Sequence, residues 1–349
     1  MAIGRGKIKW RIMTDPRNRR IRLQCYATTL LLALSCGAAA QTCFDSSDMD
    51  VPTRTALESS AKRFFDMAAH GDTAALKQNS IPSLASDFSA VEAAIKDNQS
   101  NFLGAQATSR PPFLLKVEGS APLPRAEFLC GVFGRSGQTA NSAEFVIPNL
   151  LPGNYGMVIL DVPGTKGSYT VSFVLQQQAA DWKVGGFYVK PSQIGGHDGK
   201  WFADRARAFQ AKGQQRNAWL YYLEARELAV PVPFMSTQMS DKLYDESQGL
   251  QPADLPRDGT TIDLTAEGKI YKLTTIFPLA VGDDLDLVVK YQSADVSNTA
   301  KTFQENRVVI QALLARFPEF RDAFDGVVAR AVEPSGRDYG SLLPMKEIK

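Results

Sequence analysis

The sequence predicts an α+β protein made of three folded modules behind a removable leader segment. Three observations predict this class. The apolar positions follow helical spacing first and then alternate strictly. This order predicts helices followed by an antiparallel meander, and it argues against a parallel sheet. Two helical segments with a glycine between them come next, and a turn-rich linker then precedes a second set of strands. The chain has 349 residues, of which 44% are hydrophobic and 22% charged, as is ordinary for a folded protein.

The leader is predicted over residues 1–40. Several arginines lie between positions 17 and 22, an apolar run covers 26–40, and this run ends on three alanines before Gln41. That is the pattern of a signal peptide cut after Ala40, and it predicts an exported protein, in the periplasm or outside the cell. The run is shorter than the roughly 20 apolar residues that cross a bilayer, so no integral membrane span is expected after cleavage. A lipid anchor on Cys36, in a loose match to a lipobox, is the alternative.

Removal of the leader changes both the charge and the cysteine count. The chain has 39 basic and 37 acidic residues, and the leader holds eight of the former and one of the latter, so the net charge changes from +2 to −5. A mildly acidic protein has no electrostatic reason to bind nucleic acid or an anionic membrane. Cys43 and Cys130 remain, and in an oxidising compartment they are predicted to form a disulfide, with two free thiols as the alternative.

The first module is predicted over 41–198 and begins with helices. Apolar residues at helical spacing between Leu57 and Ala68 give the first helix one buried face, and His70-Gly71 ends it. The pattern then becomes alternating, and the last two strands form an antiparallel hairpin. The predicted strands cover residues 113–118, 127–133, 156–162, 169–175 and 182–189.

The final hairpin carries a resemblance to a known family. The residues Trp182-Lys183-Val184 and Phe187-Tyr188 resemble the W-K-V-x-x-F-Y strand of the nuclear transport factor-like superfamily. The resemblance implies helices packed into a strongly curved, cone-shaped sheet, a fold that serves dehydratases, isomerases, small-ligand binders and scaffolds. Enzymes of that superfamily place Asp, His or Tyr inside the cone. Here Ser, Thr, Gly and Gln stand between the apolar strand positions, which argues against an enzyme.

The second module is predicted over 199–255 as a helical hairpin that turns at Gly213. Residues 201–231 resemble a single tetratricopeptide repeat in their order of aromatic and small residues, although Arg205 stands where the repeat usually has leucine. No second clear copy follows, and three or more repeats are normally needed for a free-standing stack. The expected facing residues are Phe202, Ala206 and Phe209 in one helix and Ala218, Tyr222 and Ala225 in the other.

Two further aromatic residues of the hairpin, Trp219 and Tyr221, fall outside this facing surface. Exposed aromatic side chains are common anchors of protein interfaces, so these two are the candidate contacts for a partner protein. A third helix is expected within 236–250. The alternative is a hairpin that only bridges the modules on either side of it.

The third module is predicted over 256–349 as a small β-β-β-α-β unit, in which no family is recognised. Strands are expected at 261–265, 270–277, 285–291 and 327–332, with an amphipathic helix that ends before Pro318. The polar segment 335–341 is expected to be a loop. Its Arg337 is a candidate contact for an anion such as carboxylate or phosphate, and the alternative is an ion pair with Glu333 or Asp338.

Motifs for catalysis, cofactors and metals are not found. The sequence has no Gly-x-Ser-x-Gly and no phosphate-binding Gly-x-x-x-x-Gly-Lys. His70 and His197 have no second histidine or cysteine at ligand spacing, so no metal site is expected. No catalytic residue and no cofactor are therefore predicted.

These observations favour a non-enzymatic exported protein that acts through contacts with an unknown protein partner in the envelope or the medium. The alternative is that the first module encloses an apolar pocket that binds a small ligand or transforms it, as a lyase or isomerase would. A pocket of several hundred Å³ with a buried Asp, Tyr or Arg inside the cone would favour that alternative. A filled apolar interior would argue against it.

Overall fold

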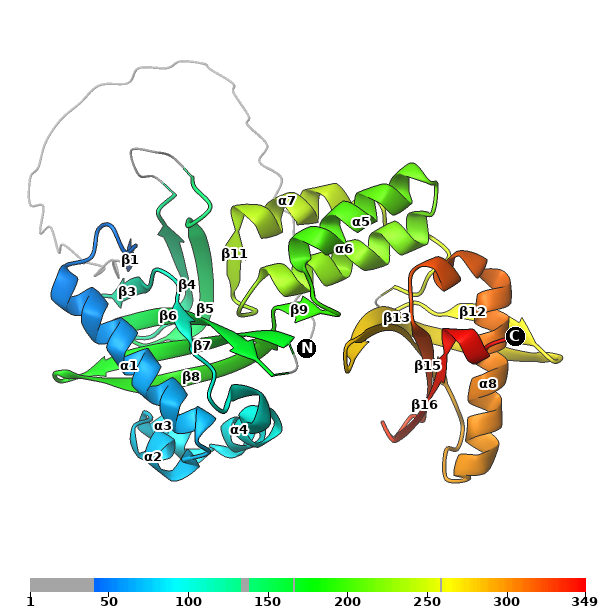
Figure 1. The fold of residues 1–349 in the computed structure, drawn as a ribbon, viewed down its shortest axis with the longest axis horizontal. Coiled ribbons are helices and arrows are strands. Elements are labelled where there is room, and N and C mark those ends of the chain that lie inside the picture. Colours follow the sequence, from blue (N-terminus) through cyan, green and yellow to red (C-terminus); the bar gives the residue numbers. More distant parts are fainter. Residues whose placement is uncertain (1–40, 133–137, 166, 258) are drawn as a thin grey trace, which may run out of the picture. The chain divides into compact units, whose positions relative to one another are not determined.

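The computed structural model describes residues 41–132, 138–165, 167–257 and 259–349 (Figure 1). The predicted signal peptide, its cut after Ala40 and the alternative lipid on Cys36 lie outside the described residues. The described residues form a mixed α+β fold of helices and mainly antiparallel sheets.

The first region begins with the short strand β1 (Gln41–Phe44), which the sequence pattern did not predict, and the expected helices follow it as four segments. The first, α1, is capped by Asp50, whose side chain accepts a hydrogen bond from the Thr53 amide, and it ends at His70 before Gly71 at φ +73°. Its apolar stripe is buried from Leu57 to Ala68. The four helices are α1 (Val51–Ala69), α2 (Thr73–Gln78), α3 (Pro82–Ser86) and α4 (Ser89–Phe102).

These helices pack on a six-stranded antiparallel sheet with the order β1-β3-β6-β7-β8, in which β2 pairs with β6. The segment 169–175, predicted to be a strand, lies within β7. Val171, Phe173 and Leu175 belong to the core beneath the helices, and Thr170 and Ser172 between them are buried as well. The strands are β1 (Gln41–Phe44), β2 (Thr108–Ser109), β3 (Phe113–Val117), β6 (Gly153–Gly164), β7 (Gly167–Gln178) and β8 (Asp181–Pro191).

A second, three-stranded sheet packs on the other face of the first one. It consists of β4 (Leu123–Cys130), β5 (Ala143–Leu150) and β11 (Met235–Thr237). In β6, Val158 and Leu160 belong to the core beneath the helices, whereas Met157 and Ile159 belong to the core between the two sheets. The large sheet is therefore buried on both faces.

The predicted disulfide is present between the two sheets. Cys43 in β1 and Cys130 in β4 lie at disulfide distance, with Cα atoms 5.2 Å apart. The bond joins strands that are 87 residues apart in the chain. It ties an end strand of the large sheet to the smaller sheet that covers it.

The helical hairpin is formed by α5 (Gly199–Ala211) and α6 (Gln215–Ala229), with Gly213 in the turn at φ +75°. The six residues expected to face each other are all buried. A third helix, α7 (Gln238–Ser247), starts at a capping box formed by Thr237 and Ser240. A short two-stranded sheet, β9 (Gln193–Ile194) and β10 (His197–Asp198), precedes the hairpin.

The C-terminal region is a five-stranded sheet in the order β12-β13-β14-β15-β16. The strands β14 and β15 are parallel because α8 connects them, and the other pairs are antiparallel. The elements are β12 (Ile262–Ala266), β13 (Lys269–Val281), β14 (Asp284–Gln292), α8 (Thr299–Arg316), β15 (Gly326–Val332) and β16 (Asp338–Pro344), with short 3-10 turns at Pro318–Asp322 and Met345–Glu347.

The β-β-β-α-β prediction for this region is wrong by one strand, because β16 begins within the segment expected to be a loop. Every second residue of β16 points inward, namely Tyr339, Ser341 and Leu343, and the residues between them are exposed. Of these three, Tyr339 and Leu343 pack against the core. The inward position of a polar residue, Ser341, and the outward position of Leu342 conceal the alternation in the sequence. The helix α8 and the hairpin share one apolar core with the sheet.

Candidate functional site

The interior of the first region is filled. Between the helices and the large sheet, the rings of Phe64, Phe65, Phe102 and Phe173 are each at most 1% exposed. Phe64 lies 6.2 Å from Phe173 and Phe65 lies 5.6 Å from Phe102, measured between ring centroids. This dense aromatic packing gives no support to a ligand pocket inside the first module.

The two histidines have structural surroundings. Nδ1 of His70 lies 2.7 Å from the carbonyl oxygen of Asp66 at the end of α1. The His197 ring stacks on Trp201 with centroids 3.8 Å apart. Among the described residues, no group of three or more His, Cys, Asp or Glu side chains is arranged to hold a metal ion. In the same part of the chain, none of the helices combines the length and apolar character of a membrane span.

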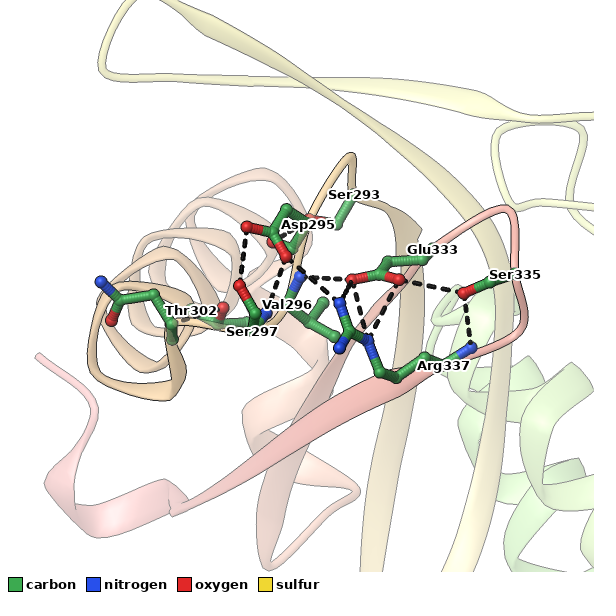
Figure 2. Close-up of polar contacts among 9 residues, drawn as sticks. Ser293, Asp295, Val296, Ser297, Thr302, Glu333, Ser335 and Arg337 are labelled. Atoms are coloured by element: carbon green, nitrogen blue, oxygen red, sulfur yellow. Dashed lines mark hydrogen bonds and ion pairs between the residues drawn. The ribbon is translucent and has the colours of Figure 1, made fainter.

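Arg337 belongs to a closed cluster of charges at the ends of β14 and β15 (Figure 2). The Glu333 carboxylate is its centre, and it accepts hydrogen bonds from the Arg337 guanidinium (2.6 Å), the Val296 amide (2.7 Å) and the Ser335 hydroxyl (2.9 Å). The Arg337 hydrogen bonds, followed by that of the Val296 amide, lower the pKa of Glu333 to about 2. The guanidinium also lies 3.3 Å from Asp295.

This cluster does not suit an anion. Two carboxylates surround one guanidinium, so the group carries a net negative charge and repels a further carboxylate or phosphate. The Arg337 guanidinium is thus already engaged, and the structure gives no support to the expected anion contact. The pairing with Glu333 that was the alternative is present, whereas Asp338 pairs with Arg330.

Tyr221 is buried rather than exposed, which corrects the expectation that it contacts a partner. The residue is 5% exposed, its hydroxyl donates to the carbonyl oxygen of Ala323, and its ring contacts Phe209 and Phe324. Burial raises the pKa of Tyr221 to about 12. The helix α6 packs against both α5 and the C-terminal region, so its buried surface is wider than the single face inferred from the repeat pattern.

Trp219 stays partly exposed and lines a groove of about 400 Å³. The other walls come from the linker, through Gln251, Pro256 and Arg257, and from residues 274–276 of β13. The groove thus joins a partly exposed aromatic side chain to a strand.

The strand in this groove has an unpaired edge. The strand β12 pairs with β13 only as far as Leu273, and the register of β13 against β14 then shifts at Thr274, whose hydroxyl donates to the carbonyl oxygen of Lys290 (3.3 Å). Beyond this bulge, residues 275–281 pair with β14 on one side, and no other described strand pairs with them on the other. Pro278, which has no amide hydrogen, stands where an edge strand tolerates it.

A second hollow, of about 560 Å³, lies at the ends of β14 and β15. Thr274 belongs to the walls of both hollows, and Glu333 lines the second one. Bulges are frequent next to functional sites because they redirect side chains and end strand pairing. Sequence reasoning identified Trp219 but missed the unpaired edge of β13. The available signal for it was Pro278, because a proline inside a strand pattern indicates an edge strand.

Comparisons with family models, with curated proteins and with solved structures found no match to this chain.

Proposed function

We propose that this chain is an exported, non-enzymatic protein that binds an extended segment of another protein in the groove beside Trp219. The proposal rests on one observation: the partly exposed Trp219 side chain lines the same groove as the unpaired edge of β13. The link between Cys43 and Cys130 supports a place of action outside the cytoplasm. The first region, which we propose to be a member of the cone-shaped superfamily, then serves as a scaffold.

The groove offers two kinds of contact. Free backbone amide and carbonyl groups of β13 add a strand by main-chain hydrogen bonding, which is a recurring mode of peptide recognition. Because Pro278 cannot donate, the useful edge is residues 274–277. The Trp219 ring packs a large apolar side chain of the bound segment. The tetratricopeptide-like hairpin acts here as one wall of the groove, since one repeat forms no concave surface of its own.

A photo-crosslinking amino acid at position 219 tests this proposal in cells that export the chain. We expect an adduct whose cross-linked peptide comes from one defined segment of a partner. The same amino acid in place of Leu129, which is 45% exposed in β4, is the matched control and should not give this adduct. An identical adduct pattern at both positions, or none at 219, would contradict the proposal.

A synthetic peptide of the captured segment then gives the quantitative test. We expect Trp219→Ala to weaken its binding by about 30-fold, as is typical when an interface tryptophan is truncated. Trp201→Ala, on α5 and 37% exposed, should leave binding unchanged. Equal affinities for the wild type and Trp219→Ala would place the segment elsewhere on the chain.

A further inference from the structure

Among the described residues, helices cover one face of the C-terminal sheet and none covers the other. In β14, alternate residues from Leu285 to Tyr291 belong to the core shared with α8 and the hairpin. The residues between them, Asp286, Val288 and Lys290, therefore point to the opposite face, because successive side chains of a strand alternate between faces. We call this opposite face the open face.

An apolar row crosses the open face from strand to strand. The register pairs Phe277 with Val288, Val288 with Val328, and Val328 with Leu342. Val288, at the centre of the row, is 1% exposed, whereas Phe277 and Val328 on either side of it are partly exposed and none of the three core clusters of the described residues includes them. Leu342 is 42% exposed, and Leu279, in the next row, is 44% exposed. An apolar stripe of this kind on a sheet face is typical of an interaction surface.

Opposite charges flank this row on β14. Asp286 is only 3% exposed and lies over Gly326, where an added Cβ would come within 2.8 Å of the Asp286 carboxylate. Within the described residues it has no hydrogen bond and no ion pair, and burial together with the like charges of Asp284 and Asp325 raises its pKa. A buried carboxylate without a partner is costly, so it favours any contact that supplies a cation.

Lys290 is the complementary group on the other side of the row. Its ammonium lies 5.6 Å from the centroid of the Phe277 ring, and no ion pair to it is found in the described part of the chain. Asp286 and Lys290 are both two residues from Val288, on the same strand and the same face. The order along β14 is thus acid, apolar, base.

We propose that the open face binds the open face of a second copy of this chain in a two-fold symmetric dimer. A two-fold axis that lies midway between the two faces and runs along the apolar row, across the strands, brings Asp286 of each copy opposite Lys290 of the other and lays the two apolar rows against each other. A face that carries its own complement about such an axis is what an isologous interface requires. Packed sheets lie about 10 Å apart, a distance that a lysine side chain helps to span.

The size of the open face sets the expected strength. The four strands that the row crosses are about 4.8 Å apart and about seven residues long, which gives on the order of 500 Å² per copy. Two such faces bury about 1,000 Å², the low end for a specific interface, so we expect a dimer of micromolar affinity. The dimer uses a face of the sheet and goes beyond the proposed function, which uses the edge of β13.

Sedimentation velocity on the purified exported chain, from about 1 µM to about 500 µM, tests this proposal. We expect a monomer–dimer equilibrium in the wild type. Asp286→Lys and Lys290→Asp each place like charges opposite one another and should weaken the dimer at least ten-fold. The double variant restores opposite charges and should dimerise again. A wild type that stays monomeric at the highest concentration overturns the proposal, as does a folded double variant that fails to regain the dimer.

A second variant guards against misfolding of the charge variants. Leu342→Glu changes an exposed position in the row and should abolish the dimer while circular dichroism shows a folded chain. Leu129→Glu is its matched control, at a similarly exposed leucine in β4, and should leave the dimer intact. Trp219→Ala should also leave it intact, so failure of the dimer and failure of the groove are told apart. Dimerisation that survives Leu342→Glu would contradict the open face as the interface.

Discussion

The two large sheets of this protein differ in how many of their faces are covered. The six-stranded sheet has helices on one face and a second sheet on the other. In the part of the chain that the structure describes, the five-stranded sheet has α8 and the hairpin on one face and no layer on the other. Their central strands record the difference. The strand β6 contains the continuous apolar run 157–160, while β14 places Asp286 and Lys290 among its valines and leucines. A strand covered on both faces reads as uniformly apolar, whereas two charged residues on one face of a strand whose other face is buried indicate that this face is not covered by a second layer.

The largest expected effect comes from truncating one phenylalanine in each sheet. Phe173→Ala removes a fully buried ring in β7 and should lower the free energy of unfolding by about 3 to 5 kcal/mol. Phe277→Ala removes a partly exposed ring from the open face and should cost about 1 kcal/mol, because less apolar surface leaves contact with neighbours. Urea denaturation at low protein concentration measures both. Equal losses for the two variants would mean that the open face is covered in solution.

Removing the disulfide is expected to have the next largest effect. The bond closes 87 residues and joins the two sheets of the first region, so the double variant Cys43→Ser/Cys130→Ser should lose about 2 to 4 kcal/mol of unfolding free energy. The reduced wild type is the control and should unfold at the same urea concentration as the double variant. If the variant matched the oxidised wild type instead, the second sheet would hold its position by packing alone.

Two buried carboxylates extend the comparison between covered and open faces. Glu224 in α6 is enclosed by the protein, whereas Asp286 lies on the open face. Burial, together with the negative charge of Glu227, raises the pKa of Glu224 to about 7. The positive charge of Lys190 lowers this pKa, but by less than burial raises it. Glu227 itself engages the Lys190 ammonium at 2.7 Å. The folded state therefore keeps the Glu224 proton at a pH where the unfolded state, with a pKa near 4.5, has released it.

The sign of the pH dependence follows from this raised pKa. Unfolding releases a proton between pH 4.5 and about 7, so stability falls as the pH rises through that window. Glu224→Gln should remove this slope and stabilise the protein at pH 8 by about 1 to 3 kcal/mol. Glu227→Gln, the control on the same helix, should narrow the window without removing it. Denaturation curves at several pH values would contradict the prediction if the wild type showed no slope there.

Local patterns predicted much of the secondary structure, and contacts distant in sequence account for what was missed. The alternation of 169–175 and the helical spacing after Leu57 identified β7 and α1. The strand β5 contains Pro148, and β11 is three residues long and pairs with β5 across some ninety residues, so neither gave a local signal. The disulfide was predictable because the expected removal of the leader leaves only Cys43 and Cys130.

The candidate site was predictable only in part. Trp219 stood out because it falls off the packing face of the hairpin, but Tyr221 shared that property and is buried, since α6 has two neighbours rather than one. Alternation divides β14 into two sets of residues but does not say which set a helix covers. The unpaired edge of β13 depends on where β12 begins, at Ile262 opposite Leu273. Pro278 indicates an edge strand, but no residue of the sequence marks the position at which the pairing with β12 starts.

The smallest expected effect concerns the charge cluster at Glu333, which lies beside the open face rather than in a core. Arg337→Met removes the hydrogen bonds that contribute most to the low pKa of Glu333, so that pKa should rise from about 2 towards its ordinary value of 4.5. A carboxyl with a lowered pKa stabilises the fold above that ordinary value and loses its contribution as the pH falls towards 2. Because exposed ion pairs contribute little, the melting temperature at pH 7 should change less than in the variants above. NMR titration of the Glu333 carboxyl carbon measures the shift, with Arg330→Met as the control because Arg330 pairs with Asp338. A Glu333 midpoint that moved equally in both variants would show that the general charge of this end of the sheet, and not the Arg337 contact, sets its ionisation.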